Sequence, residues 1–458
     1  MDMKSEFAEA AELALERCGE TFIRLTHHEG EGNNHLYYQH EVSASVFETT
    51  IRHLGAALSI YSQTKDTRFK DCAIAIGNGL LPAFDTKFGL AMHAVAIGTN
   101  TANNEGWTGH RHILSEVGSL QLEFRYLTYV SRDDRYANAA NRFTEHLQNQ
   151  LEAGWPKNES CYSDGAPQMP HKGLWPVFIE SETGKFCGAA GMASLSDSFY
   201  EYLLKQWILF GKTDDHLLEM YEDAVEGILD HLLKYTPKSH LAFVGHFGIG
   251  FEPTMDHLAC FVPGMLTLGV MHGAHRHEGR SRHWGDNEVI TAAADLAATC
   301  FRLYAESPSG IGPEIVRFMP NGTYRVDNPK YILRPETIES LFYLYRYTND
   351  KKYRDWAAAI AHSIDQQCRT PAAFAALKDV ERERPIKVDS MESFFLAETL
   401  KYLYLILEAD EGVLDLDRFV LNTEAHPLPI IHDGAKYEPQ GVGSRMASKV
   451  FARYRASS

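Results

Sequence analysis

The sequence predicts an all-α protein built from repeated helical hairpins. One observation is the recurrence of apolar helical stretches, among them LGAALSIYS, SLQLEFRYLTYV, FYEYLLKQWILFG and ESLFYLYRY. The other is that each stretch runs into a related turn: Ser or Thr, any residue, Asp, two further residues and a large apolar residue. Hairpins that each hide one face against their neighbours form either an open solenoid or a closed helical toroid.

Four such turns begin at Thr64, Ser131, Thr213 and Thr348. The Ser or Thr is the expected N-cap of the next, polar-faced helix, with an acidic residue in the first turn behind it. The more apolar helix of each pair is expected on the inner side. Strand-like runs are few and short, as in LAFVG, and are expected to form hairpins on one face.

Charge and composition argue against several classes of function. The 458-residue chain has a net charge of −17, which repels phosphate backbones and anionic lipid, so we expect neither a nucleic-acid partner nor membrane contact. The start, MDMKSEFAEAAELALERCGE, has the pattern of an acidic amphipathic helix rather than a signal peptide. The histidines of MHGAHRHEGRSRHWGD match no standard metal-ligand spacing. Seven cysteines are too sparse for a zinc site or a disulfide scaffold, although one bridge could form.

An acidic residue lies near the expected start of each inner helix. Because a helix rises about 1.5 Å per residue, these acids should fall at the same end of the assembly and would converge on one mouth if the toroid closes. A single acid there is explained by the helix dipole alone. Their common register, together with nearby Arg52, His257 and Arg334, favours an acidic pocket. The four acids are Glu48, Glu116, Asp197 and Glu336.

Further features are ambiguous when judged by spacing alone. Arg334 and Glu336 in YILRPETIES suit polyol recognition, because carboxylate and guanidinium groups offer paired hydrogen bonds to vicinal hydroxyls. Spacing alone predicts that Phe394 is a core residue. Glu398, four residues later, lies on the same helical face, and this favours a place for that face in a site. Thr423, in NTEAHP, is predicted to be part of a turn. It becomes a candidate ligand only if the protein binds a hard, oxygen-seeking cation.

Seven segments resemble, in order, the signatures of glycoside hydrolase family 47, the class I α-1,2-mannosidases. They are FETTIR, SEVGSLQLEF, DSFYEYLLKQW, MDHLACFVPG, LRPETIESLFYLYR, DSMESFFLAETLKYL and NTEAHP, and the match runs from about residue 41 to 430. The resemblance implies an (α/α)7 barrel with Ca²⁺ bound at its base. It also implies hydrolysis of terminal α-1,2-linked mannose from high-mannose N-glycans with inversion, a reaction that needs two carboxyls about 6.5 to 9.5 Å apart.

The same resemblance suggests roles for individual residues. By resemblance, Glu48 matches the family's general acid, which acts through a water, and Glu336 matches its general base. Asp197 matches the third essential carboxylate. Which of Glu336 and Asp197 activates the water stays open. Thr423 would bind Ca²⁺ through its hydroxyl and carbonyl oxygens. Leu195 stands where Arg is typical of the endoplasmic-reticulum type and Leu of the Golgi or fungal type, which implies trimming of several mannoses. The remaining pocket positions are Arg52, Glu116, His257, Arg334, Phe394, Glu398 and Glu424.

The resemblance also bears on compartment and domain organisation. Cys260 and Cys300 match the family's disulfide pair, which implies an oxidising compartment, either the Golgi and endoplasmic reticulum or the exterior of the cell. We expect one catalytic domain over 1–458, monomeric, with 1–40 as a remnant of the first helical repeat, 41–430 as the barrel and 431–458 as a C-terminal extension. An SLDTL-like motif before FETTIR is missing, so the first hairpin should be truncated. HEVSASVFETT has two extra residues, which could shift Glu48.

Two other readings remain open on the sequence. One is a folded, catalytically silent mannose-binding protein of the glycoprotein quality-control kind, although a binding module has no reason to keep all three carboxylates. The other is an unrelated helical-toroid hydrolase or lyase, which requires the ordered motifs to be accidental. The sequence favours the glycosidase.

Overall fold

The computed structural model describes residues 4–18, 42–152, 171–274, 284–409 and 411–431. The chain divides into two compact units. The first comprises Met1–Pro156, Phe178–Lys185 and Val420–Ser458, and the second comprises Lys157–Val177 and Phe186–Phe419. The histidine-rich segment 275–283, the sequon at Asn158 and the expected extension after residue 431 lie outside the described residues.

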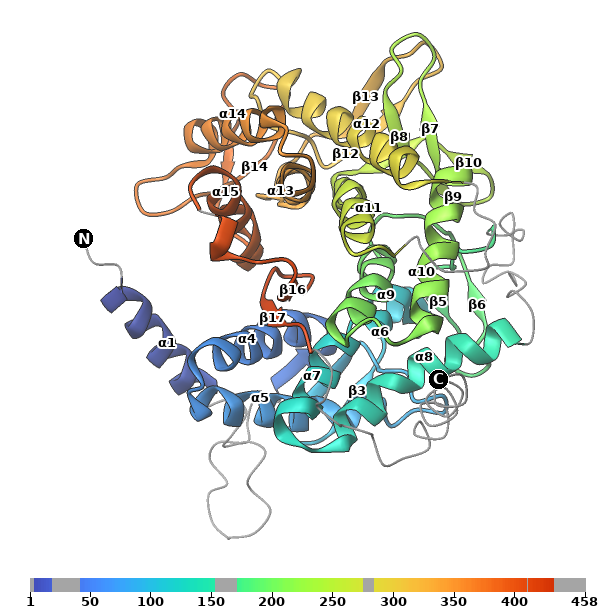
Figure 1. Cartoon of the computed structure of the whole chain (residues 1–458), viewed down its shortest axis with the longest axis vertical. Helices are drawn as coiled ribbons and strands as arrows, with labels where there is room; N and C mark the ends of the chain where they lie inside the picture. The colour runs from blue at the N-terminus through green and yellow to red at the C-terminus, as the bar shows by residue number, and fades with distance from the viewer. Residues whose placement is uncertain (1–3, 19–41, 153–170, 275–283, 410, 432–458) are drawn as a thin grey trace, which may run out of the picture. The chain divides into compact units, whose positions relative to one another are not determined.

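Helical hairpins supply most of the regular structure in each unit (Figure 1). In the first unit the packed pairs are α4 (Gly55–Thr64) with α5 (Thr67–Leu80) and α7 (Gln121–Ser131) with α8 (Asp134–Glu152). In the second unit they are α9 (Asp197–Leu209) with α10 (Asp215–Gly227), α11 (Val262–Met271) with α12 (Asp286–Ala305), and α13 (Glu336–Thr348) with α14 (Lys351–Cys368). The predicted all-α organisation in hairpins is confirmed.

The other helices lie outside these pairs. They are α1 (Lys4–Cys18), α3 (Val46–Glu48), α6 (Leu114–Gly118) and α15 (Leu400–Leu407), the 3₁₀ helices η3 (Leu81–Phe84), η4 (Gly106–Thr108), η6 (His257–Phe261) and η8 (Glu411–Val413), and the π-helices η2 (Thr49–Leu54), η5 (Ile228–Leu232) and η7 (Phe395–Thr399). Among them, α3, η2, α6, η6 and η7 carry predicted site residues. Within the described ranges, no helix is long and apolar enough to cross a membrane.

Burial differs between the two helices of a hairpin as their apolar content predicts. Nine of the 13 residues of α13 are buried, whereas only five of the 18 residues of α14 are. The buried residues of α14 recur every three or four positions, so this helix covers the core with one stripe and exposes the rest. The first helix of the pair therefore has few solvent-facing positions, and a charged side chain on it must find protein partners.

The four predicted turns are capped by Asp rather than by the expected Ser or Thr. Asp66 accepts a hydrogen bond from the Arg68 backbone N–H at 3.0 Å, whereas Thr64 accepts from the Asp66 N–H at 3.2 Å. The predicted cap is wrong because Lys65, in the left-handed conformation, ends the preceding helix and leaves Thr64 in its last turn. A further turn is capped by Asp214. The same two hydrogen bonds recur in two other turns. Ser131 and Thr348 accept from the N–H groups of Asp133 and Asp350, and these aspartates in turn accept from the N–H groups two residues later.

Short antiparallel sheets complete the fold. In the first unit β1 (Val42–Ser45), β2 (Ala94–Ile97) and β3 (Thr101–Asn103) pair in that order, with Val42 opposite Ile97. In the second unit β11 (Thr254–Asp256), β12 (Ile315–Phe318) and β13 (Tyr324–Asn328) do the same, with Asp256 opposite Ile315. LAFVG forms β8 (Ala242–Val244), paired with β7 (Leu233–Tyr235), as expected of a hairpin. The other strands are β4 (His112–Ile113), β5 (Phe178–Ile179), β6 (Phe186–Cys187), β9 (His246–Phe247), β10 (Phe251–Glu252), β14 (Ala376–Leu377), β15 (Lys387–Val388), β16 (Phe419–Leu421) and β17 (Pro427–Pro429).

Disulfide bonds are more numerous than cysteine spacing suggested. Cys260 of η6 is bonded to Cys300 of α12, as the resemblance implied. A second bond joins Cys18 of α1 to Cys72 of α5, and Cys187 is also disulfide-bonded. The sequence indicated one possible bridge and did not reveal the others, because pairing depends on the distance between Cα atoms in space, which spacing along the chain does not report.

Removal of the Cys260–Cys300 bond should lower the melting temperature. The bond closes a loop of 40 residues, and loss of a bridge of this kind costs about 2–4 kcal/mol of unfolding free energy, chiefly through the unfolded chain. We expect Cys300→Ala to melt well below the wild type in a thermal scan. Cys368→Ala is the control, because it removes a buried thiol that forms no bridge. Equal losses in the two variants would contradict the assignment.

Candidate active site

The four acids found by register lie in the first turns of helices, as predicted. Asp197 and Glu336 are the first residues of α9 and α13, Glu116 lies in the first turn of α6, and Glu48 ends the short helix α3. Glu48 and Glu116 belong to the first unit, and Asp197 and Glu336 belong to the second. Convergence of all four on one mouth stays a prediction.

Glu336 is a buried carboxylate with a histidine partner. Its Oε2 lies 2.8 Å from Nδ1 of His257, whose Nε2 lies 2.7 Å from the Tyr304 hydroxyl. Burial by itself would raise the pKa of Glu336, but the hydrogen bond from His257 and the charge of Arg334 outweigh it and lower that pKa. Glu336 is therefore ionised at neutral pH, and the Nδ1–H of His257 donates to it.

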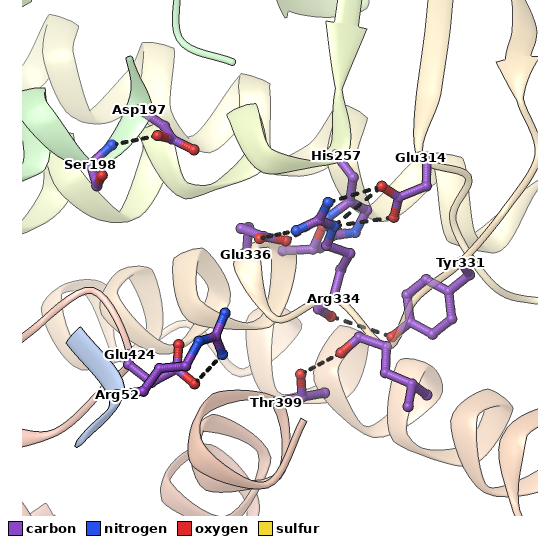
Figure 2. A network of polar contacts seen from close by, with 12 residues as sticks. Arg52, Asp197, Ser198, His257, Glu314, Tyr331, Arg334, Glu336, Thr399 and Glu424 are labelled. Carbon is purple, nitrogen blue, oxygen red and sulfur yellow. Dashed lines mark hydrogen bonds and ion pairs between the residues drawn. The ribbon is translucent and has the colours of Figure 1, made fainter. Parts of the chain in front are cut away.

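Arg334 links Glu336 to a second carboxylate (Figure 2). Its Nε and Nη2 donate to Oε1 and Oε2 of Glu314 at 3.1 and 3.0 Å, and its Nη1 lies 3.7 Å from Oε1 of Glu336. The guanidinium also lies over the ring of Phe394, 5.7 Å from its centroid. We call His257, Glu314, Arg334 and Glu336 the Arg334 cluster. In it one cation is shared by two acids and an aromatic face.

Asp197 has a raised pKa, unlike Glu336. Burial raises the pKa of Asp197 to about 7, the Ser198 backbone N–H that donates to Oδ1 at 2.8 Å opposes this, and the charges of Glu201 and Glu336 raise it further. The charge of Glu336 thus acts on Asp197, and both carboxyls stand at helix starts of the second unit. One carboxyl of the pair is thus held ionised, and the other is poised between its two protonation states.

Phe394, Glu398 and Leu195 also lie in the second unit. Phe394 is buried and packs on Arg334, so its side chain contacts the Arg334 cluster as well as the core. Glu398 is buried in η7. Burial raises the pKa of neighbouring Tyr402, and the charges of Glu339 and Glu398 add to the rise. Leu195 has φ of 80°, a left-handed conformation that is uncommon for a residue with a side chain.

Several buried charged residues of the second unit were not predicted from the sequence. Lys205 forms an ion pair with Glu201, and both lie on the same face of α9 as Asp197. Tyr402 donates to Glu339 at 3.2 Å, and burial raises the pKa of Glu339 above its ordinary range while Lys205 opposes the rise. The only sequence signal was the spacing of four between Glu201 and Lys205, and this spacing is equally typical of an ion pair on a helix surface.

In the first unit, Arg52 joins Glu48 and Glu424, and Figure 2 shows its contact with Glu424. Its Nε donates to Oε2 of Glu48 at 2.7 Å, and its Nη1 donates to Oε1 of Glu424 at 2.7 Å. Glu424 is buried, whereas the Glu48 side chain is 48% exposed. Glu48 and Arg52 are four residues apart on one helical face, so the guanidinium reaches both Glu48 and the buried Glu424.

Glu116 pairs with a histidine that the sequence analysis did not single out. His93 Nδ1 lies 2.7 Å from Oε1 of Glu116, and its Nε2 lies 3.2 Å from Oε1 of Glu105. The hydrogen bond with Glu116 raises the pKa of His93, with further contributions from Glu105 and Glu48. His93 therefore brings Glu116 and Glu48 into one electrostatic neighbourhood, although no sequence motif marks it.

The NTEAHP loop that holds Thr423 is fixed by Asn422. Asn422 Oδ1 accepts from the backbone N–H groups of Glu424 and His426 at 3.1 and 2.8 Å, and its Nδ2 donates to Oε1 of Glu123 at 2.7 Å. Thr423 is half-buried between two buried residues. Its hydroxyl and carbonyl are both oxygen donors, the kind that a hard cation such as Ca²⁺ prefers. Among the described residues, no group of three or more His, Cys, Asp or Glu could hold a metal ion.

Glu314 is the most consequential residue that the sequence analysis missed. It lies just before β12, and its backbone carbonyl accepts from the His257 N–H at 2.8 Å. Pairing of β11 with β12 thus brings Glu314 to His257 and Arg334. The only sequence signal is an acid before a short apolar run, which is common at strand starts.

Comparison with known proteins identifies the family to which the chain belongs. Residues 1–430 match the family model described as glycosyl hydrolase family 47. The chain belongs to this family. The matched range includes the first 40 residues, which the sequence analysis set apart as a remnant.

Curated relatives carry the names of processing mannosidases. The chain is 40% identical over 407 residues to the human "Endoplasmic reticulum mannosyl-oligosaccharide 1,2-alpha-mannosidase", covering 86% of this chain and 54% of that protein. It is 39% identical over 400 residues to "Mannosyl-oligosaccharide alpha-1,2-mannosidase IA" of Drosophila melanogaster, covering 86% and 56%. The chain thus spans little more than half the length of these relatives.

Solved structures agree on the fold. The α-1,2-mannosidase from Trichoderma reesei superposes with a TM-score of 0.73 at 30% identity, covering 85% of this chain and 82% of that one. A D-mannose isomerase superposes with a TM-score of 0.54 at 13% identity, covering 86% and 96%, and shares the fold alone. The first match confirms the predicted α/α fold class.

The raised pKa of Asp197 predicts a pH-dependent stability difference. Between about pH 4, the ordinary pKa of Asp, and pH 7, the folded state holds a proton at Asp197 that the unfolded chain has released. Folding stability therefore falls as the pH rises through this window. Asp197→Asn removes the effect, so its melting temperature relative to the wild type should be more favourable at pH 8 than at pH 4. Asp71→Asn, on the exposed side of α5, controls for loss of net charge. A difference that is constant with pH would contradict the assignment.

Proposed function

We propose that this protein is an inverting glycosidase that removes terminal α-1,2-linked mannose from high-mannose N-glycans. Family membership and the names of the relatives support the reaction class. The observation that carries the proposal is the contrast between two helix starts of the second unit, where Glu336 is held ionised and the pKa of Asp197 is raised to about 7. Inversion requires one ionised carboxylate as the base and a second carboxyl group that can be protonated as the acid, so their pKa values must differ.

Glu336 is the better candidate for the base. Inverting hydrolysis begins when a carboxylate takes a proton from water as the water oxygen attacks the anomeric carbon. Glu336 is ionised at neutral pH, whereas Asp197 would be protonated in a substantial fraction of molecules. His257 orients the Glu336 carboxylate through Nδ1. Asp197 then serves as the third carboxylate, which responds to the charge of its neighbours.

Glu48 is proposed as the acid that protonates the departing glycosidic oxygen through a water. Its partly exposed side chain is compatible with delivery through solvent, and Arg52 fixes its Oε2. Arg334 and Phe394, with Arg52, Glu116, Glu398 and Glu424, would contact the sugar, because paired carboxylate and guanidinium groups match vicinal hydroxyls. Leu195, rather than Arg, supports trimming of several mannoses.

Ca²⁺ is the proposed cofactor, with Thr423 as its protein ligand. When bound, the ion would anchor sugar hydroxyls in a flexible oxygen shell and favour a distorted ring. Asn422 keeps the loop in shape for this purpose, through its bonds to the N–H groups of Glu424 and His426. The disulfide bonds and the relatives' names are consistent with action in the secretory pathway, and we propose that the chain acts there as a monomer.

The proposal predicts calcium-dependent release of mannose. Protein supplied with Ca²⁺ should release mannose from α-1,2-linked mannobiose, and NMR of the fresh product should show the β anomer first. Chelation should abolish release and lower the melting temperature, because a ligand that binds the native state stabilises it. Binding of the disaccharide with no release at any Ca²⁺ concentration would favour the mannose-binding alternative instead.

Glu336→Gln should abolish turnover while it spares binding. Gln keeps the size and can still accept from His257, but it cannot take a proton, so kcat should fall by about 10³-fold or more. Calorimetry should find mannobiose affinity within about threefold of the wild type. Glu392→Gln, on the exposed surface of the second unit, is the matched control. A Glu336→Gln rate close to wild type would remove this residue from the mechanism.

A further inference from the structure

We propose that Thr399 is a positioning residue for Arg334 and Glu336, because its hydroxyl holds the strained turn at Leu333 that presents both of them. This inference rests on the proposed function for its catalytic meaning. Thr399 touches neither of the two side chains in any contact described above. It acts through the backbone, from the end of η7 to the start of α13.

The turn before α13 adopts a conformation that its sequence does not favour. Leu333 has φ of 69° and no solvent exposure. A left-handed backbone is disfavoured for any residue with a Cβ, and it persists only where the surroundings over-determine it. The residues that follow are Arg334, Pro335 and Glu336, so the direction in which the chain leaves Leu333 sets where the guanidinium and the carboxylate begin.

Side-chain hydroxyls hold two successive carbonyls of this turn (Figure 2). Thr399 Oγ1 donates to the Leu333 carbonyl at 2.7 Å, and the Tyr331 hydroxyl donates to the Arg334 carbonyl at 3.3 Å. Pro335 has no N–H, so the turn lacks one of the backbone donors that would otherwise hold it. Thr399 and Tyr331 are fully buried, and water therefore cannot easily replace either donor.

The place of Thr399 also couples the turn to a second site segment. Thr399 is the last residue of the π-helix η7, directly after Glu398, and Phe394 at the start of η7 packs on Arg334. Single π-helical turns inside helices often accompany functional sites, because they re-aim side chains locally. The hydroxyl therefore ties the segment that carries Glu398 to the segment that carries Glu336. A shift of one without the other would spoil the contacts of the Arg334 cluster.

Three variants separate positioning from general stability. Thr399→Val keeps the shape and removes the donor, and Thr399→Ser keeps the donor. Thr267→Val is the matched control, because Thr267 is equally buried and donates to the Pro263 carbonyl at 2.7 Å inside α11, away from the strained turn. Tyr331→Phe tests the same turn independently if Thr399→Val does not fold.

We expect Thr399→Val to lower kcat for mannobiose about 10- to 100-fold with KM changed less than about threefold, as for a small misplacement of reacting groups. Tyr331→Phe should show a smaller loss, and Thr399→Ser and Thr267→Val should keep kcat within about threefold. The acid limb of the kcat/KM profile should also move to higher pH in Thr399→Val, because Glu336 would lose part of the help that lowers its pKa. Wild-type kcat in Thr399→Val, or equal losses in Thr267→Val, would overturn the inference.

A readout that does not depend on turnover distinguishes this inference from the proposed function. A carboxyl with a lowered pKa stabilises the folded state above its unfolded pKa, and that contribution is lost on acidification. The melting-temperature difference between wild type and Thr399→Val should therefore be larger at pH 7 than at pH 4. If the wild type released no mannose, the proposed function would fail, and this pH-dependent difference would still confirm or overturn the positioning role.

Discussion

The need to keep Glu336 charged inside the protein governs how the second unit is built around it. An isolated buried carboxylate takes up a proton, because desolvation penalises its ionised form. Arg334 and His257 prevent this from two different elements, the turn before α13 and η6. Arg334 in turn is held by Glu314, so the position of the cation does not depend on the acid that it stabilises. Removal of Arg334 would leave the buried carboxylates of Glu314 and Glu336 without their shared cation.

Arg52 follows the same physical logic in the first unit. It lies between a buried acid, Glu424, and a more exposed one, Glu48. The buried acid anchors the guanidinium, and the guanidinium fixes the exposed acid. A long flexible Glu side chain loses much rotamer freedom when it is held in one place, and an anchored partner offsets part of that entropy cost. Arginine suits this role better than lysine because its planar fork can donate in two directions at once.

The sequence predicted the parts of this arrangement that are local. Helix starts follow from apolar periodicity and turn residues, so the hairpins and the first-turn positions of Asp197 and Glu336 could be read from the chain. Glu314 could not, because strand pairing brings it to Arg334, which is 20 positions further along the chain. The N-caps were misassigned for a related reason: Ser, Thr and Asp can all cap, and the left-handed residue between them decides which one does. Cys18 and Cys72 likewise meet through tertiary packing alone.

Backbone strain recurs beside the proposed catalytic and binding residues. Leu195 precedes Asp197 by two positions, Leu333 precedes Glu336 by three, and Ala425 follows Glu424 directly, all with positive φ. Glycine would adopt these conformations without steric penalty, yet it would also leave the turn free to adopt others. A residue with a side chain is held there only by its surroundings, which makes the turn conformation conditional on correct packing. The strain therefore ties the position of each acid to the folding of the elements around it, and it is best tolerated where a displaced carboxylate would be costly.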